Sequence, residues 1–429
     1  IRFDTEITNS TYQHLLWSMA IDSGDDKIFQ LFEDIIFNND EIGKVTRNII
    51  KALLNSEKKE SWQLVEKLLL SAQRQEGLRQ TILEALDETS IGALKYMIDV
   101  IIENKLTRFS SVVRSIDTWT GLGWDSEKET TVRAILSFAQ QFLNNPETIK
   151  DGIESKNNNE VYMALWSQGV LDIEKTAPFL HQLLDKGSIE KKSLALKFAR
   201  EIGHPYIEMP LYFKALDDEN LQVLAFALPG LEALLSANVN SKFYIDNADY
   251  PDFFEKIYNL TQKIDFKEKV FEGKVFSWLN TKFDRNSLYQ SLIYLAGDHK
   301  EKLETILNHF EEFSINLRET ITRTVLKDFY CYSFSYGGNN KENQIPTDSQ
   351  RQFALRILKD RGESILASAV NVLSKFELTE SELGTFQDLL KRKNSTLRKN
   401  LLSLILKQND KAVAPFIENT IENGDIEQR

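Results

Sequence analysis

Three consecutive segments of the chain repeat one another at helical spacing, and this repetition constrains the fold more than any other feature. The segments are 27–54, 61–86 and 91–116. When they are aligned, Phe32, Val65 and Met97 coincide, and apolar residues coincide again three and four positions later. Equivalent positions lie 33 residues apart in the first two segments and 32, falling to 31, in the next two, which indicates a one-residue deletion in the third connection. Such periods are typical of helical-repeat proteins.

Each segment contains two amphipathic patterns joined by a short polar turn. In the second pattern, Ile49, Ile82 and Val113 fall at the same position. Two helices of this length cannot bury their apolar faces alone, but stacked pairs form a continuous core. We therefore predict an all-α fold, an α-α superhelix built as a solenoid of stacked helical hairpins.

A second pair of repeats follows at 172–203 and 204–235, where the run from Leu194 to Phe198 falls on the run from Leu224 to Leu228. The stretch "ALDDENLQVLAFALPGLEAL" resembles the HEAT repeat, with acidic turn residues before a helix that has small apolar positions. This resemblance implies a HEAT/armadillo-like solenoid. Pro229 departs from the pattern and is expected to kink or end the second helix.

We predict five segments stacked as one elongated solenoid. They are amino-terminal helical repeats at 1–121, HEAT-like repeats at 122–236, an irregular helical region at 237–330, a loop insertion at 331–348 and carboxy-terminal helical repeats at 349–429. Residues 236–284 are the least regular part. There, "VFEGKVFSW" fits either a short hairpin strand or an irregular helix.

Composition and motifs narrow the function classes. The net charge of −12 disfavours nucleic acid and anionic membranes as partners unless a local basic patch exists. Cys331 is the only cysteine, which excludes an internal disulfide and Cys-based zinc sites, and a cytoplasmic protein is expected. No apolar run is long enough for a membrane span, and the start "IRFDTEITNS" suggests a fragment or processed form. No phosphate-loop, dinucleotide, nucleophile-elbow or zinc-protease motif is present, so we expect no cofactor or metal.

The stretch "SSVVRSIDTWTGLGW" at 110–124 raises the sharpest local question. It lacks a lysine and follows a helix, which argues against a phosphate loop, so Gly121 or Gly123 is expected to end the third repeat in the left-handed conformation. Trp119 is expected to cover the end of that repeat, while Trp124 is equally compatible with a structural or a contact role. The candidate partner-binding residues at this corner are Arg108, Arg114, Asp117, Trp119 and Trp124.

Two further clusters are candidate contacts. Tyr332, Phe334 and Tyr336 alternate in the loop insertion, and they suit either a contact loop or a loop that tucks its aromatic rings against the solenoid. A basic run is a weak candidate for phosphate binding, although a solvated helix face explains it better. Its cations are Lys391, Arg392, Lys393, Arg398 and Lys399.

The run "RFSSVVRSIDTWTGLGW" (108–124), with "ILEALD" and "MIDVIIEN" upstream, is similar to the helical-repeat region of very large bacterial proteins of unknown function. The resemblance implies an architecture and a bacterial setting rather than a reaction. Two hypotheses stay open: a non-enzymatic scaffold that binds a protein partner, or a nucleic-acid-binding protein of the HEAT-like DNA glycosylase type. The second requires the basic residues to share one face with Trp119 or Trp124.

Overall fold

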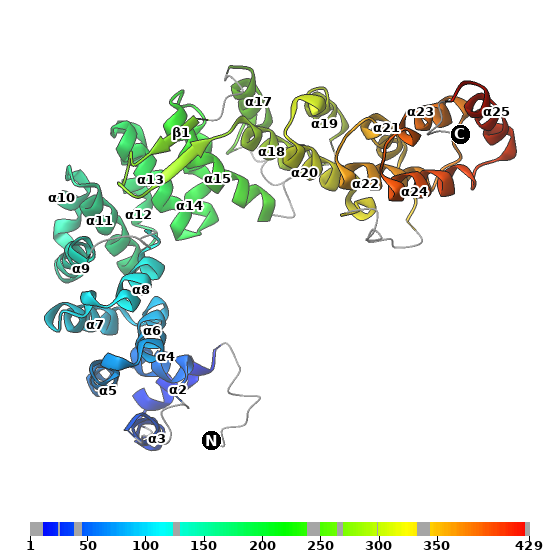
Figure 1. The fold of residues 1–429 in the computed structure, drawn as a ribbon. Helices are drawn as coiled ribbons and strands as arrows, with labels where there is room; N and C mark the ends of the chain where they lie inside the picture. The colour runs from blue at the N-terminus through cyan, green and yellow to red at the C-terminus, as the bar shows by residue number, and fades with distance from the viewer. Residues whose placement is uncertain are drawn as a thin grey trace. The chain divides into compact units, whose positions relative to one another are not determined.

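The structure is a computed structural model that describes residues 12–24, 26–37, 45–122, 129–237, 249–263, 269–297, 299–332 and 344–424. In these ranges the chain is almost entirely helical, with a single two-stranded sheet (Figure 1). The all-α fold class is thereby confirmed. No helix in the described ranges is both long and apolar enough to cross a bilayer.

The chain forms two compact units. The first comprises residues 1–234 and 267–284, and the second comprises 235–266 and 285–429. The segment 267–284 thus belongs to the first unit, although in the sequence it lies between two stretches of the second unit.

Helical hairpins build the first unit. Its α-helices are α2 (Gln13–Asp22), α3 (Asp26–Phe37), α4 (Arg47–Asn55), α5 (Lys59–Ser71), α6 (Glu76–Glu84), α7 (Ile91–Glu103), α8 (Ser110–Thr120), α9 (Glu129–Asn144), α10 (Ile149–Glu154), α11 (Asn158–Leu171), α12 (Thr176–Lys186), α13 (Ile189–Ile202), α14 (Pro205–Ala215) and α15 (Leu221–Ala237). Short 3-10 turns at Ala72–Arg74, Ala85–Glu88, Leu106–Arg108 and Pro146–Thr148 complete it.

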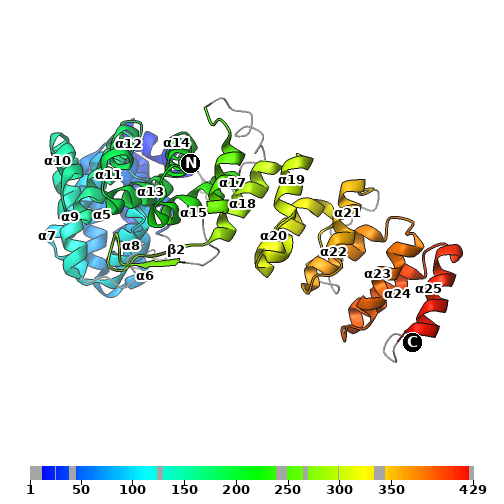
Figure 2. The same cartoon turned by 90° about the horizontal axis from the view of Figure 1, so that it is seen from above.

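The second unit continues the same construction. Its α-helices are α17 (Phe253–Lys263), α18 (Arg285–Ala296), α19 (Lys300–Leu307), α20 (Ile315–Leu326), α21 (Asp348–Ile357), α22 (Glu363–Leu373), α23 (Glu380–Leu390), α24 (Ser395–Ile405) and α25 (Asp410–Asn423), with 3-10 turns at Phe310–Glu312 and Lys327–Phe329. Figure 2 shows the hairpins α21/α22 and α23/α24 following one another along this unit.

The amino-terminal repeats predicted from the sequence correspond to the hairpins α3/α4, α5/α6 and α7/α8. Phe32, Val65 and Met97, which coincide in the alignment, are all fully buried. The second helices α4, α6 and α8 pack in sequence, and Figure 1 shows them in a row beside their first helices. Equivalent positions therefore occupy equivalent places in the core, as expected when repeats stack on their neighbours.

Polar contacts also join residues about one repeat apart. The Asn55 amide donates to the Glu88 carbonyl oxygen (2.8 Å), and the Arg79 guanidinium donates to the Ser111 hydroxyl (2.7 Å). In the second unit, Arg351 forms an ion pair with Glu382 at 2.8 Å. These three polar groups thus find partners on the adjacent repeat, as expected where repeats contact their nearest neighbours.

A β-hairpin departs from this nearest-neighbour rule. Strands β1 (Lys269–Glu272) and β2 (Asn280–Phe283) pair antiparallel, with Lys269 opposite Phe283. Of the two structures that fit "VFEGKVFSW" in the sequence, a hairpin strand and an irregular helix, the hairpin is therefore the one observed. Asn158 donates its amide to the Val275 carbonyl (2.8 Å), although the two residues are 117 apart in sequence. The hairpin therefore holds helices of the first unit from outside the repeat order.

Of the two outcomes expected at Pro229, a kink or the end of the helix, the end does not occur, because α15 continues from Leu221 to Ala237 through it. A proline lacks the N–H that would bond the carbonyl four residues earlier, here that of Ala225. That carbonyl instead accepts a hydrogen bond from the Thr281 hydroxyl of the hairpin (3.3 Å). The next residue, Gly230, packs against the Tyr212 ring where a Cβ would not fit. The hairpin and Tyr212 thus accommodate the Pro-Gly pair.

Candidate functional site

Several hydrogen bonds from distant parts of the first unit converge on the end of α8. The helix stops at Gly121, which has φ +64° and donates its N–H to the Asp117 carbonyl (2.8 Å). A left-handed residue at this place favours glycine because it has no Cβ. Of the two glycines expected to stop the helix, Gly121 does so, and Gly123 lies outside the described residues.

Four consecutive carbonyl groups at this corner each accept a hydrogen bond from a side chain of a later element. The carbonyls of residues 119, 120, 121 and 122 bind the Trp166 indole (3.0 Å), the Tyr162 hydroxyl (2.5 Å), the Lys197 ammonium (2.9 Å) and the Trp278 indole (3.2 Å), respectively. A helix end exposes carbonyls without intrahelical partners, and these donors from α11, α13 and the hairpin satisfy them.

Trp119 itself reaches back to the preceding repeat. Its indole N–H donates to the Leu83 carbonyl oxygen in α6 (2.7 Å), and the ring is half-buried. Trp119 therefore bridges α6 and, through its own carbonyl, α11. Trp124 lies outside the described residues.

A surface pocket of about 220 Å³ opens beside this corner. The ends of α8, α11 and α13 surround it, and its lining includes Trp119, Gly121, Trp166, Gly169, Phe198 and Glu201. Glu201 pairs with Lys197 at the rim. The walls are mainly aromatic and aliphatic, so the pocket suits an apolar side chain whose approach is framed by charged groups.

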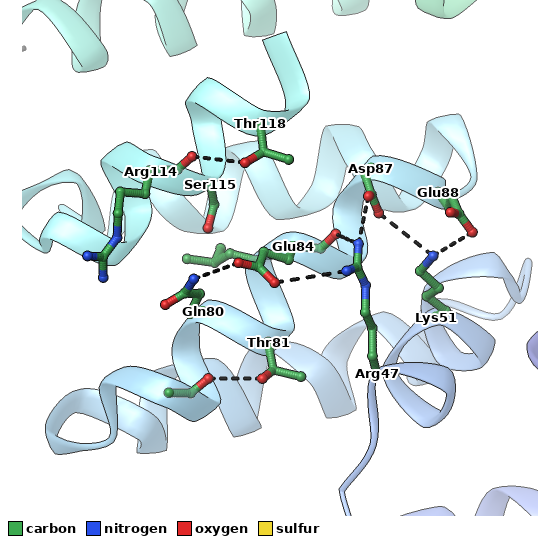
Figure 3. A network of polar contacts seen from close by, with 12 residues as sticks. Arg47, Lys51, Gln80, Thr81, Glu84, Asp87, Glu88, Arg114, Ser115 and Thr118 are labelled. Atoms are coloured by element: carbon green, nitrogen blue, oxygen red, sulfur yellow. Dashed lines mark hydrogen bonds and ion pairs between the residues drawn. The ribbon is translucent and has the colours of Figure 1, made fainter. Parts of the chain in front are cut away.

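The basic residues of this corner already have partners within the chain. Arg114 forms an ion pair with Glu76 of α6 (2.6 Å), and both side chains are about half exposed. The Arg108 guanidinium lies over the Phe109 ring, 4.6 Å from its centroid. Asp117 is half-buried on α8. Arg108 thus lies in the turn before α8, and Arg114, Asp117 and Trp119 lie on α8 itself. The Arg114 side chain points away from Arg47 and Lys51 (Figure 3).

A charged network between α4 and the end of α6 was not predicted from the sequence. Arg47 pairs with Asp87 (2.6 Å) and donates to the Glu84 carbonyl, while buried Lys51 pairs with Glu88 (2.5 Å), as Figure 3 shows. The hydrogen bond from Lys51 lowers the pKa of Glu88. Lys51 interrupts the apolar run "IIKALL", and that interruption is the signal that could have identified it.

The basic run at 391–399 divides into two groups. Lys391 pairs with Asp388 (3.3 Å), and Arg392 donates to the Lys359 carbonyl (3.1 Å), where it caps the end of α21. The other three cations, Lys393, Arg398 and Lys399, line a shallow surface groove along α24.

Of the aromatic loop candidates, Tyr332 is 69% exposed and Phe334 and Tyr336 lie outside the described residues. The backbone leading to Tyr332 is docked on α22. There the Ser368 hydroxyl accepts from the Cys331 N–H (2.8 Å), and the Asn371 amide donates to the Phe329 carbonyl (3.0 Å). Tyr332 is therefore presented at the surface by a fixed backbone.

One buried carboxyl group has a raised pKa. Glu208 of α14 accepts a hydrogen bond from the Tyr212 hydroxyl (3.3 Å), and burial raises its pKa above the ordinary value of 4.5. Burial likewise raises the pKa of Tyr212. Among the described residues, no three His, Cys, Asp or Glu side chains gather in an arrangement that could hold a metal ion.

The profile of the family of unknown function DUF5724 matches residues 2–429, nearly the whole sequence. The chain belongs to this family. A search of curated proteins finds no match. Among solved structures, the crystal structure of an engineered protein from the Northeast Structural Genomics Consortium is similar, with 12% identity over 94% of this chain and 98% of that one and a TM-score of 0.38. This weak similarity carries no argument about function.

Proposed function

We propose that this chain is a HEAT-like scaffold that binds a protein partner and catalyses no reaction. The observation that supports this most directly is the aromatic pocket at the end of α8. Protein interfaces draw much of their binding energy from a few apolar anchors that enter well-formed pockets. The walls here are pre-organised, because hydrogen bonds fix both the Trp119 and the Trp166 indole rings.

The proposed partner inserts one apolar side chain between Trp119 and Phe198. The neighbouring Lys197–Glu201 pair then lies at the rim, where charges select orientation more than they add affinity. The bacterial setting and the cytoplasmic location implied by the sequence belong to the same proposal.

Filling the pocket tests this function. Gly169 lies in α11 and lines the pocket, and a Cβ built there has its nearest neighbours at 3.5–3.8 Å, which is ordinary contact. Gly169→Leu therefore adds its outer carbons to the pocket while the helix is kept. Gly384→Leu is the matched control, because Gly384 lies in α23 with no atom within 4 Å of an added Cβ.

The assay is affinity capture from native cells with the full chain, scored for both protein and nucleic acid. We expect the wild type and Gly384→Leu to retain the same protein partner and Gly169→Leu to lose it, with equal helical circular dichroism in all three. Equal capture by Gly169→Leu would refute a role for the pocket.

The alternative, a nucleic-acid-binding protein, is an outcome of the same assay. It draws on Arg108 and Arg114, and phosphate contact at Arg114 requires displacement of the Glu76 carboxylate. An exposed ion pair of this kind contributes about 1 kcal/mol or less to stability, so a polyanion that binds Arg114 loses little binding free energy by displacing Glu76. Capture that is abolished by nuclease treatment would replace the scaffold proposal with this one.

A further inference from the structure

One face of α24 combines cations with exposed leucines. Arg398, Lys399, Leu402 and Leu406 recur at spacings of three and four residues, so they form a single stripe along the helix. The opposite face, which includes Leu397 and Leu401, is buried in the second unit. Leu402 is 49% exposed and Leu406 is 74% exposed. The helix thus has a second apolar edge that the fold does not use.

Cations lie along this edge and at both of its ends. Lys393 precedes the stripe and Lys407 follows it, and both line the same shallow, open surface groove as Arg398 and Lys399. In the part of the chain that the structure describes, no acidic side chain lines the groove. The segment 391–407 holds six cations and no acid in a chain whose net charge is −12. The local field therefore opposes that of the protein as a whole, and it attracts anionic groups.

We infer that this groove binds an acidic amphipathic helix of a partner protein, an inference that rests on the proposed partner-binding function and adds a second contact site to it. Leu402 and Leu406 are spaced to meet an apolar stripe on a facing helix, as in helix-in-groove recognition. The four cations then face carboxylates that flank that stripe. Charge complementarity favours the encounter, and the leucines supply apolar area.

Two other anionic surfaces fit the groove less well. Nucleic-acid single strands require aromatic platforms for the bases, and none of the residues lining the groove is aromatic. A bilayer requires a helix that sinks its apolar face into the headgroup boundary, whereas the main apolar face of α24 is already buried in the protein core.

The test uses the full chain and three fluorescein-labelled peptides of equal length. The first carries leucines at positions i, i+4, i+7 and i+11 with glutamates on the flanks. The second has the same composition with the leucines scattered, and the third replaces the leucines with alanine. We expect the first peptide to bind at least about tenfold more tightly than either of the others, as measured by fluorescence anisotropy.

Variants place the binding on α24. Lys399→Glu with Lys407→Glu, and separately Leu402→Asn with Leu406→Asn, are each expected to weaken the first peptide by about tenfold or more. Lys391→Glu is the control for charge, because Lys391 lies in the same segment outside the groove. Ile189→Asn is the control for the loss of an exposed apolar residue elsewhere, since Ile189 is 40% exposed on α13. Both controls are expected to bind as the wild type does.

The inference is overturned if the scattered-leucine peptide binds equally well, because charge alone then explains binding. It is also overturned if a single-stranded oligonucleotide or phosphatidylserine vesicles compete fully while the first peptide binds only weakly. Gly169→Leu is included as a third arm. If the peptide fails while partner capture still depends on Gly169, this inference fails and the proposed function stands. If the peptide binds to α24 while Gly169→Leu captures the partner as the wild type does, only the proposed role of the pocket fails.

Discussion

Gly121 and Gly203 form a natural pair for measuring how tightly the corner at the end of α8 is packed. Both end a helix in the left-handed conformation, at φ +64° and +63°. They differ in their surroundings. A Cβ at Gly203 meets nothing within 4 Å, whereas one at Gly121 lies 2.6–2.9 Å from the side chain of Glu201. Alanine therefore adds the same backbone strain at both sites, but it adds a steric clash only at Gly121.

The expected magnitudes follow from these two terms. Left-handed backbone costs a residue with a Cβ about 1–2 kcal/mol, so Gly203→Ala should lower the free energy of unfolding by roughly that amount. At Gly121 the added carbon must also displace Glu201, which pairs with Lys197, the donor to the Gly121 carbonyl. Overpacking costs about 1–3 kcal/mol, and the low end, about 1 kcal/mol, applies here because the displaced atoms belong to the end of a flexible, part-exposed side chain. Gly121→Ala should thus lower the free energy of unfolding by about 2–3 kcal/mol, the sum of the two terms.

Urea unfolding, followed by tryptophan fluorescence and circular dichroism, gives the free energy of unfolding of both variants, and both substitutions lie in the first unit. A double-mutant cycle with Glu201→Ala then isolates the clash. We expect Gly121→Ala to cost about 1 kcal/mol less in the Glu201→Ala background, and Gly203→Ala to cost the same in both backgrounds. If Gly121→Ala destabilises no more than Gly203→Ala, or if Glu201→Ala brings no relief, the close packing derived for this corner is wrong.

Three other expectations concern the first unit. Tyr162→Phe leaves the buried Thr120 carbonyl without its donor, so it should lower the free energy of unfolding by about 1–3 kcal/mol in urea melts, and an unchanged value would contradict the role of that bond. Burial raises the pKa of Glu208, so the folded state binds the Glu208 proton more tightly than the unfolded state does. The wild type therefore loses stability as pH rises from 4.5 through the raised pKa. Over that pH window the thermal midpoint of Glu208→Gln should rise relative to that of the wild type, and below it the two midpoints should match. A constant difference across pH would exclude this linkage. Leu68→Asp puts an unpaired charge in the core of α5 and should destabilise the unit by at least about 4 kcal/mol, whereas Leu68→Met should cost less than about 1.5 kcal/mol by the same measurement.

The helical repeat was predictable from sequence because burial imposes a local pattern. Phe32, Val65 and Met97 recur at the repeat period and are buried at equivalent places, since each hairpin covers its apolar face with the next. The stop at Gly121 was predictable for a similar reason, because a left-handed helix end selects glycine through its own backbone.

Only the tertiary structure decided which groups meet at the candidate site. Trp166, Lys197 and Trp278 converge on the end of α8 from positions 47 to 156 residues away from their acceptors, and no periodicity encodes those distances. The fate of Pro229 was decided in the same way, because the hydroxyl that satisfies the Ala225 carbonyl belongs to a distant hairpin. Short-range patterns report where apolar side chains must be buried, whereas the partners of a polar group depend on how the whole chain folds back on itself.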